Sequence, residues 1–519
     1  MRKERACNFA EKKMNGQKSE EPVMADALLA RAQSSWNAMT RYRQDRDRCK
    51  RFTYGDQWSD MVESAGGVMS EEAEMRSHGR TPLKNNLIRR LVRNVLGVFR
   101  DRYAQPACIA RDGTESLQAM TMQKLLRYNA ELNRMGEIYA RTMEEFLISG
   151  MCVHKKWYGR KGRLTDCWTD FVQPDKFFMD MNGRDFRGWD ISLIGEIHDM
   201  TPATLLATFA GSEEKRDRLL KCYGGLADRA YDRVCRVWEI WERMYPVRWH
   251  CHDRVTGRCW KVGEELYPAV RAENRRRRKE GIPEVETHWY VDDEWRWSFV
   301  TPGGMVIDSG VSPYRHGGHP YVFKAYPFVN GEIHSFVSDI IDQQKYTNRL
   351  ISMYDWILKS SAKGVLLMPE NALPKGVDLD AVAEEWSRFD GVIVFRPHAG
   401  EPLPQQISSK CTDIGVTELL NIQMKMMEDI SGVNGALQGK LDSSSMSGTL
   451  YNQQTRNSLT ALSDLMSCFD DFIKQCTAMD ADNIGQFYTP DRIRRVAGIG
   501  SGLMTDRFFD CSQFDFSFE

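Results

Sequence analysis

The sequence lacks several features that would assign it to a common class. It contains no apolar run of the roughly 18 residues that a membrane-spanning helix needs, so we expect no membrane partner. Residues 1–5 are polar and charged, unlike the apolar part of a signal peptide. The 13 cysteines form no CxxC pair and are odd in number, which favours free thiols in a reducing cytoplasm over a disulfide framework.

A large net charge is also missing. The 71 basic and 72 acidic residues leave a net charge of -1, whereas a protein that wraps nucleic acid tightly is usually basic. If DNA is a partner, its contact with this chain should be loose, as during passage through a channel. The length of 519 residues indicates about two to four folding units, and 42% hydrophobic and 28% charged residues are normal for globular proteins.

Catalytic motifs are weak. Segment 435–441 resembles a phosphate-binding loop, but only three residues separate its glycines and Leu441 stands where Ser or Thr would bind magnesium. No Ser-His-Asp or Cys-His arrangement follows from the spacing. Four aspartates at five-residue intervals would suit a two-metal nuclease, although their setting predicts turns instead: Asp175, Asp180, Asp185 and Asp190. We therefore expect no enzyme, no cofactor and no resident metal.

Two further clusters have an ordinary and a functional interpretation. His250, Cys251 and His252, with Cys259 nearby, could ligate a metal, but adjacent residues of a strand point to opposite faces, and we expect ordinary loop residues. The run of four arginines at 275–278 could bind nucleic acid. A solvated helix face, or contact with an acidic neighbour, is the expected role.

The pattern of apolar residues predicts a mixed, α+β chain. Residues 1–24 suggest a loose arm, and 62–80 a surface loop. Helices are expected at 25–50, from Leu87 to Phe99, at 117–149, after Thr201 as N-cap with Pro202 in the first turn, and at 272–279. Strands are expected within 151–200, at 237–241, near 285–300, at 305–308 and at 320–328.

The last third carries the clearest pattern. One long helix is expected over 336–361, and a long apolar helix after Leu459. Between them we expect a small α/β insert, a second helix and a polar Gly- and Ser-rich stretch. In chain order the expected elements are strand 365–368, helix 379–386, strand 392–395, helix 412–431, loop 432–448, and finally a terminal strand at 514–518.

Several short strings occur in an order that resembles the portal proteins of tailed double-stranded DNA bacteriophages, most like those of short-tailed phages. The strings are Gly55-Asp56-Gln57-Trp58, Arg80-Thr81-Pro82, Asn85-Asn86-Leu87-Ile88, Pro320-Tyr321-Val322, the segment 339–348, the segment 430–434, Gly439, and Ser447-Gly448-Thr449-Leu450. The resemblance covers roughly residues 50–500.

The resemblance implies a mainly helical portal fold and a closed ring, usually of twelve subunits, at one vertex of the virion capsid. The chain would divide into an arm (1–24), wing (25–334), first stem helix (335–361), clip (362–409), second stem helix (410–432), tunnel loop (433–448), and a long wing helix with a terminal strand (449–519). The chain stops at Glu519, where such portals usually continue, so we expect little or no crown.

The same resemblance implies candidate site residues. DNA would pass a tunnel loop that carries Lys440, Asp442, Ser443, Ser444 and Ser445, whose serines and glycines favour mobility. Stem residues expected to line the channel are Lys345, Arg349, Lys359 and Lys425. Clip residues expected to bind a partner are Trp386, Arg388, Glu384, Glu385 and Asp390.

The expected partners are further copies of this chain, double-stranded DNA in the channel, the terminase large subunit, head-completion or tail adaptor proteins, and the major capsid and scaffolding proteins. Assembly would take place in the host cytoplasm. The competing class is a DNA-acting packaging enzyme, either a nuclease or an ATPase. The missing phosphate loop and the missing metal cluster favour the structural channel protein. A tail adaptor is a third class, which the length of the chain disfavours.

Overall fold

The computed structural model describes residues 21–64, 67–111, 116–185, 187–223, 234–329, 331–363, 365–369, 373, 378–387, 392–396, 405–407, 415–435, 437, 453, 456–457, 459–498 and 514–517. The chain forms two compact units. The first comprises Met1–Lys50, Val92–Ser338 and Ser443–Glu519, and the second comprises Arg51–Leu91 and Asp339–Asp442. In the described part, no helix is both long and apolar enough to cross a membrane.

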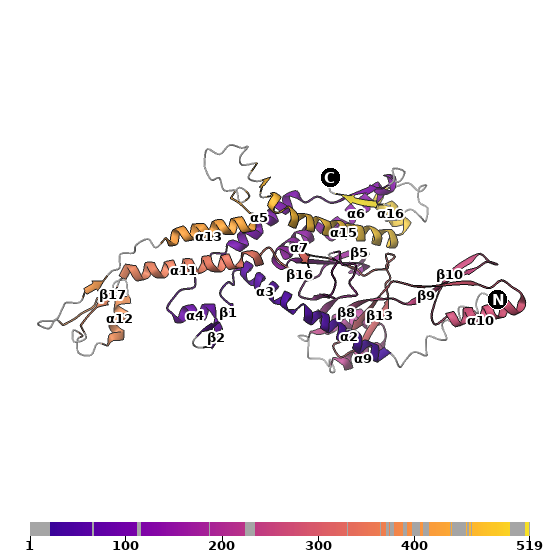
Figure 1. Cartoon of the computed structure of the whole chain (residues 1–519), viewed down its shortest axis with the longest axis horizontal. Helices are drawn as coiled ribbons and strands as arrows, with labels where there is room; N and C mark the ends of the chain where they lie inside the picture. Colours follow the sequence, from indigo (N-terminus) through magenta and orange to yellow (C-terminus); the bar gives the residue numbers. More distant parts are fainter. Residues whose placement is uncertain are drawn as a thin grey trace. The chain divides into compact units, whose positions relative to one another are not determined.

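The first unit contains most of the strands, and all of their pairings are antiparallel (Figure 1). One sheet has the order β13-β12-β8-β7-β6, a second β14-β4-β5, a third β10-β9-β11, and a fourth β19-β3. The strands are β3 (Ala107–Ala110), β4 (Met151–Lys161), β5 (Leu164–Phe171), β6 (Phe177–Met179), β7 (Leu193–Met200), β8 (Cys235–Met244), β9 (Val247–Asp253), β10 (Arg258–Gly263), β11 (Glu286–Val291), β12 (Glu294–Val300), β13 (Val306–Val311), β14 (Tyr321–Ala325) and β19 (Phe514–Ser517). The short pair β15 (Pro327–Val329) and β16 (Glu332–Ile333) follows β14.

Helices accompany these sheets. They are α2 (Glu21–Ala38), α3 (Thr40–Tyr54), α5 (Leu87–Arg102), α6 (Ser116–Asn133), α7 (Met135–Ser149), α8 (Pro202–Phe209), α9 (Glu213–Cys222), α10 (Tyr267–Glu280), α15 (Ser463–Phe487) and α16 (Pro490–Ala497). The sequence of α3 continues into the second unit, and α5 begins there.

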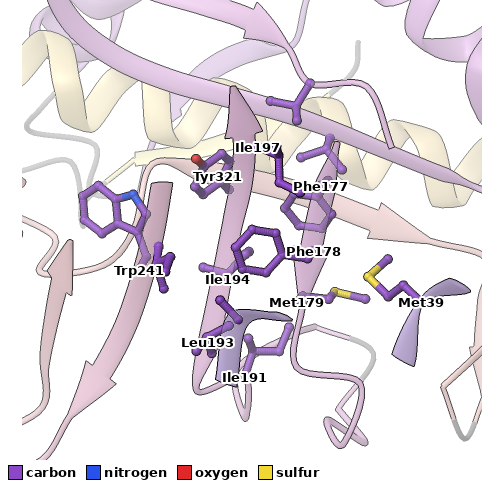
Figure 2. Packing of buried hydrophobic residues seen from close by; sticks show 14 of the residues in the cluster. Met39, Phe177, Phe178, Met179, Ile191, Leu193, Ile194, Ile197, Trp241 and Tyr321 are labelled. Carbon is purple, nitrogen blue, oxygen red and sulfur yellow. The ribbon is translucent and has the colours of Figure 1, made fainter. Parts of the chain in front are cut away.

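The main core of the first unit lies where α2 and the start of α3 pack on the large sheet and β14. Phe177, Phe178 and Met179 of β6 are completely buried, and Ile194 of β7 lies beside them. Figure 2 shows these side chains with Met39, Trp241 and Tyr321 around the same core. Buried aliphatic and aromatic side chains each contribute about 1.5–3 kcal/mol, so this cluster accounts for much of the stability of the unit.

The second unit has its own strands and helices. They are β1 (Met61–Ser64), β2 (Gly67–Ser70), α4 (Glu71–Ser77), the one-turn helix η2 (Ser338–Ile340), α11 (Ile341–Lys363), β17 (Val365–Leu367), α12 (Leu379–Ser387), β18 (Gln405–Ile407) and α13 (Val416–Ser431). Helices α11 and α13 lie side by side, and β17 pairs with β18 (Figure 1). The long helix begins at Ile341 rather than 336, because residues 338–340 form the tighter turn of η2.

Several sequence-based predictions of elements were wrong. Segment 62–80 is a hairpin followed by a helix, in which Ser70 accepts a hydrogen bond from the backbone of Ala73 as N-cap. Residues 392–396 are described without a strand, and β18 at 405–407 pairs with β17 instead. The expected single helix 117–149 is interrupted at Arg134, whose φ of 53° is left-handed.

Other predictions are confirmed. Helix α5 begins at Leu87, and Thr201 caps α8 with Pro202 in its first turn. The aspartates form turns: Asp180 accepts the backbone N–H of Asn182 at 3.0 Å, and Asp190 accepts that of Arg184 at 2.6 Å. Arginines of the 275–278 run bond to acidic neighbours. Arg277 bridges Asp253 and Glu273, and Arg278 pairs with Glu284.

Candidate functional surface of the α11 and α13 helices

Within the second unit, a ladder of buried polar side chains joins three of the strings that carried the resemblance, 55–58, 85–88 and 339–348. Gln344, Asn348 and Ser352 follow one another at intervals of four along α11, so they share one helix face. Each is no more than 1% exposed. Residues 83–86 and the first residues of α5 run along this face.

The ladder satisfies the backbone of that segment. The Leu83 N–H donates to Ser352 Oγ at 2.9 Å, and the Asn85 N–H to Asn348 Oδ1 at 3.1 Å. Gln344 Oε1 accepts from the Leu87 N–H at 3.0 Å, where α5 begins, while Gln344 Nε2 donates to the Asn85 carbonyl at 2.7 Å. Three side chains of α11 therefore hydrogen-bond to the backbone between Leu83 and the start of α5.

The aromatic turn at Gly55-Asp56-Gln57-Trp58 joins the same network. Asn348 Nδ2 donates to Gln57 Oε1 at 2.7 Å, and Gln57 Nε2 donates to the Phe52 carbonyl at 2.9 Å. Trp58 Nε1 donates to the Leu83 carbonyl at 3.2 Å. These three strings are thus parts of one hydrogen-bonded network around α11.

We expect the Gln344→Leu variant to destabilise the second unit by roughly 1–3 kcal/mol, because the N–H of the buried Ile88 loses Gln344 Oε1, its acceptor at 3.3 Å. Urea unfolding of the variant measures the loss. The matched control is Gln343→Leu, next to it on α11 and half-buried, which should change stability by under 1 kcal/mol as surface substitutions do. Equal losses in both variants would contradict the role of the ladder.

A second cluster of charges lies next to the ladder. Lys345 Nζ is 3.0 Å from Asp60 Oδ2 and 3.1 Å from Glu71 Oε2, and its side chain is only 16% exposed. Arg349 Nε donates to Glu71 Oε1 at 2.6 Å. Glu71 opens α4, where the helix dipole also favours a negative charge. The two cations are therefore balanced within the chain.

The outer faces of α11 and α13 expose many large apolar side chains. On α11 these are Tyr346, Met353, Tyr354, Trp356 and Leu358, and on α13 they are Leu419, Ile422, Met424, Met426 and Ile430. Each is more than a third exposed, with Trp356 at 43% and Ile422 at 45%. Exposed large apolar side chains in such number are typical of an interaction surface. We call these ten residues the apolar stem surface.

A comparison with known families identifies this scaffold. The family described as "Phage P22-like portal protein" matches residues 29–501, which is most of the chain and includes every string named above. The chain belongs to this portal family. No curated protein matches the chain in a direct sequence comparison.

Family membership makes this a phage portal protein, as the sequence strings predicted. Portal proteins of this family assemble into a ring at a capsid vertex and interact with capsid and DNA. The family is generally structural rather than enzymatic. The apolar stem surface is the feature of the described residues that suits self-assembly, because a single chain leaves it in contact with water.

The residues predicted for the portal channel are placed as follows. Lys425 is exposed on α13, and Lys345 and Arg349 form the ion pairs described above; their position on the channel wall stays a prediction. Lys359 belongs to α11, but its side chain lies outside the described residues. The tunnel-loop residues Lys440, Asp442, Ser443, Ser444 and Ser445 also lie outside them.

The candidate partner site of the portal clip is described in part. Glu384, Glu385 and Trp386 lie on α12, with Glu384 exposed and the other two half-buried. Arg388 and Asp390 lie outside the described residues. The assignment of this insert as the clip stays a prediction.

No local sequence pattern predicts a cluster of two acids and a histidine that lies in the first unit. Among the residues described, the one group whose ligand atoms approach closely enough for a metal is Glu196, His198 and Glu239. Lys155 already occupies it: its ammonium contacts Glu239 Oε2, which also lies 2.7 Å from His198 Nε2. Burial alone would raise the pKa of Glu239, but Lys155 and His198 hold it well below its usual range. The cluster is an internal ion-pair network.

Proposed function

We propose that this portal protein forms a ring of about twelve identical subunits at one capsid vertex, through which the genome enters during packaging and leaves during ejection. Family membership supports the ring and the vertex. A closed ring requires two different surfaces of each subunit to meet around a rotation axis. The α11 and α13 helices supply such surfaces.

The apolar stem surface is the observation that carries the proposal. Large apolar side chains occupy the exposed faces of both helices over most of their lengths. Burying one of them fully contributes about 1.5–3 kcal/mol. Repeated at every junction of a ring, contact between the α11 face of one subunit and the α13 face of the next would stabilise the closed assembly.

The charges near the start of α11 suit a channel through which DNA slides. Each phosphate that a cation neutralises adds salt-dependent affinity, so a wall of unpaired cations would hold DNA instead of letting it pass. Lys345 and Arg349 are balanced by Asp60 and Glu71. We assign the transient DNA contact to Lys440, repeated around the ring beside Asp442 and the serines Ser443, Ser444 and Ser445.

We also assign the insert between α11 and α13 to docking of the packaging motor, the terminase large subunit, and later of tail adaptors. Helix α12 has Asp380 in its first turn and carries Glu384 and Glu385. An acidic surface repels DNA and attracts a basic partner surface. Arg388, Asp390 and the half-buried Trp386 complete the proposed docking residues.

Electron microscopy of the purified protein with mass photometry tests the proposal directly. We expect rings of about twelve chains with a central opening. A compact dimer with nuclease activity would instead support the DNA-acting enzyme.

The tunnel-loop assignment has its own test. Deleting residues 442–446 should leave ring assembly intact, because the loop is not part of the apolar stem surface, but should impair packaging or retention of DNA. The measurement is the length of DNA protected inside particles assembled with the variant. Full-length packaging by intact variant rings would contradict the assignment.

A further inference from the structure

The third sheet of the first unit, β10-β9-β11, carries histidines that the sequence analysis set aside. The expectation that residues 250–252 are ordinary loop residues was wrong, because they lie in the central strand β9. Adjacent residues do point to opposite faces, but His250 and His252 are two positions apart and therefore share one face. Cys251 between them is buried on the other face.

The neighbouring strand β11 adds two more ligand types to the same face. In the antiparallel register, His288 lies opposite His250, and Glu286 lies opposite His252. Directly opposed residues have Cβ atoms about 4.5–5.5 Å apart, and positions two apart along a strand are separated by about 6.8 Å. His250, His252, Glu286 and His288 therefore occupy the four corners of a small quadrilateral. We call this set the His₃Glu quadrilateral.

Side-chain contacts establish which face this is. Lys261 of β10 and Tyr290 of β11 reach across the same face, with the ammonium 5.5 Å from the ring centroid. On the opposite face, Trp249 stacks on Tyr267 of α10 at 4.0 Å between centroids, beside the buried Val262. Helix α10 thus covers the other face of the sheet. His250 and His288 are exposed, and His252 is half-buried.

We propose that the His₃Glu quadrilateral binds a divalent transition metal ion such as Zn²⁺, with three imidazole nitrogens and one carboxylate oxygen as ligands. Imidazole and carboxylate are ordinary zinc ligands at about 2.0–2.2 Å, and four of them complete a tetrahedral site. His252 Nδ1 already lies 3.4 Å from Glu286 Oε2. This proposal is independent of ring formation and of DNA passage.

Binding would require small movements. In the described conformation the ligand atoms of the set are not all within 4.8 Å of one another. Because His250 and His288 are exposed, packing does not prevent rotation of their side chains. Glu286 also pairs with Arg254, from which the metal would draw it. Cys259 lies opposite His252 on β10, on the side away from His288, and is not part of the set.

The sheet gives a physical reason for a structural metal. Its own core contains only three buried apolar residues, Cys251, Val262 and Val285, with Trp249, Tyr267 and Val270 packed against them. Small units with little core commonly depend on a metal or disulfide for stability. An ion held between β9 and β11 would fasten the edge strand β11 to the centre of the sheet.

The test uses the untagged full-length protein, stripped with a chelator and titrated with Zn²⁺ and Co²⁺. We expect the wild-type protein to bind one ion per chain. In His250→Ala and in His288→Ala the affinity for the ion should fall at least about tenfold. Loss of a residue that merely orients a metal ligand already weakens binding about 10–100-fold, and these variants lose a ligand itself. Cys259→Ser is the matched control and should bind normally. The bound Co²⁺ should show visible d–d absorption without a thiolate charge-transfer band.

Protection of the sheet supplies a second readout. Zn²⁺ should slow proteolytic cleavage between residues 247 and 291 in the wild type and in Cys259→Ser, but not in His250→Ala or His288→Ala, because ligands stabilise only the folded state. The proposal would be overturned if the wild-type protein bound no metal. It would also be overturned if the His250→Ala/His288→Ala double variant bound metal as the wild type does, because such binding would be adventitious metal only. A thiolate band that Cys259→Ser abolishes would overturn the ligand set.

Discussion

Replacing Lys156 by methionine should lower the free energy of unfolding of the first unit by about 3–5 kcal/mol, the usual loss when one partner of a buried ion pair is removed. Lys156 of β4 is completely buried, and its Nζ donates to Asp480 Oδ2 of α15 at 2.6 Å and to Thr169 Oγ1 of β5 at 2.8 Å. Without the ammonium, Asp480 is left buried with an uncompensated charge. Urea unfolding followed by circular dichroism measures the loss.

The same strand offers a matched control. Lys161 pairs with Asp170 at 2.7 Å, but both side chains are well exposed, at 54% and 40%. Lys161→Met should therefore cost under 1 kcal/mol. The double variant Lys156→Met/Asp480→Leu should recover most of the stability, because no buried charge remains. If both single variants lost the same amount, burial would not determine the strength of these pairs.

Local rules predicted the elements whose signals lie within a few residues. Helix α8 follows from Thr201 as N-cap and Pro202 in the first turn, and both features are present. Helix α5 follows from its apolar spacing alone. The turns at Asp180 and Asp190 follow from the ability of a short carboxylate to accept nearby backbone N–H groups.

Partners far apart in the sequence could not be predicted in this way. The β-rich string 392–395 had the better strand pattern, yet β17 pairs with residues 405–407, because strand pairing is settled by tertiary context. Segment 62–80 was expected to be a loop because of its glycines and charges, whereas Ser70 and the acidic residues after it begin a helix. The helix at 71–77 therefore follows from a local capping signal that outweighs the glycines nearby.

The candidate sites show the same difference between local signals, which the sequence carries, and contacts between distant residues, which it does not. Lys345 and Arg349 were predicted as channel cations, but no sequence pattern pairs them with Asp60 and Glu71, nearly 300 residues earlier. The His₃Glu quadrilateral depends on register: His288 becomes a neighbour of His250 only once β11 is known to pair with β9. By contrast, the order of the short strings along the chain was enough to predict the family. Recognising a family from sequence does not require knowing which residues contact each other in the fold.

The apolar stem surface explains why one chain alone is an incomplete assembly unit. Trp356 and Ile422 stand on different helices, and each is exposed in the single subunit. Large apolar side chains exposed in this way are expected at surfaces that meet a partner, which fits the self-assembly that family membership implies. In the ring, each face would be covered by the neighbouring subunit, and every subunit would present both faces.

The Trp356→Glu and Ile422→Glu variants should therefore fold normally but fail to form rings under conditions in which the wild type assembles. Loss of about 1.5–3 kcal/mol per junction raises the concentration needed for assembly by at least about tenfold, and a buried carboxylate adds to the loss. Mass photometry over a dilution series measures this shift. Asn421→Glu, which places the same charge on an exposed polar position of α13, is the control and should assemble almost as the wild type does. Rings formed by Trp356→Glu and Ile422→Glu at the wild-type concentration would show that subunits meet elsewhere, since each junction that buries a new, unpaired carboxylate loses much of its stability.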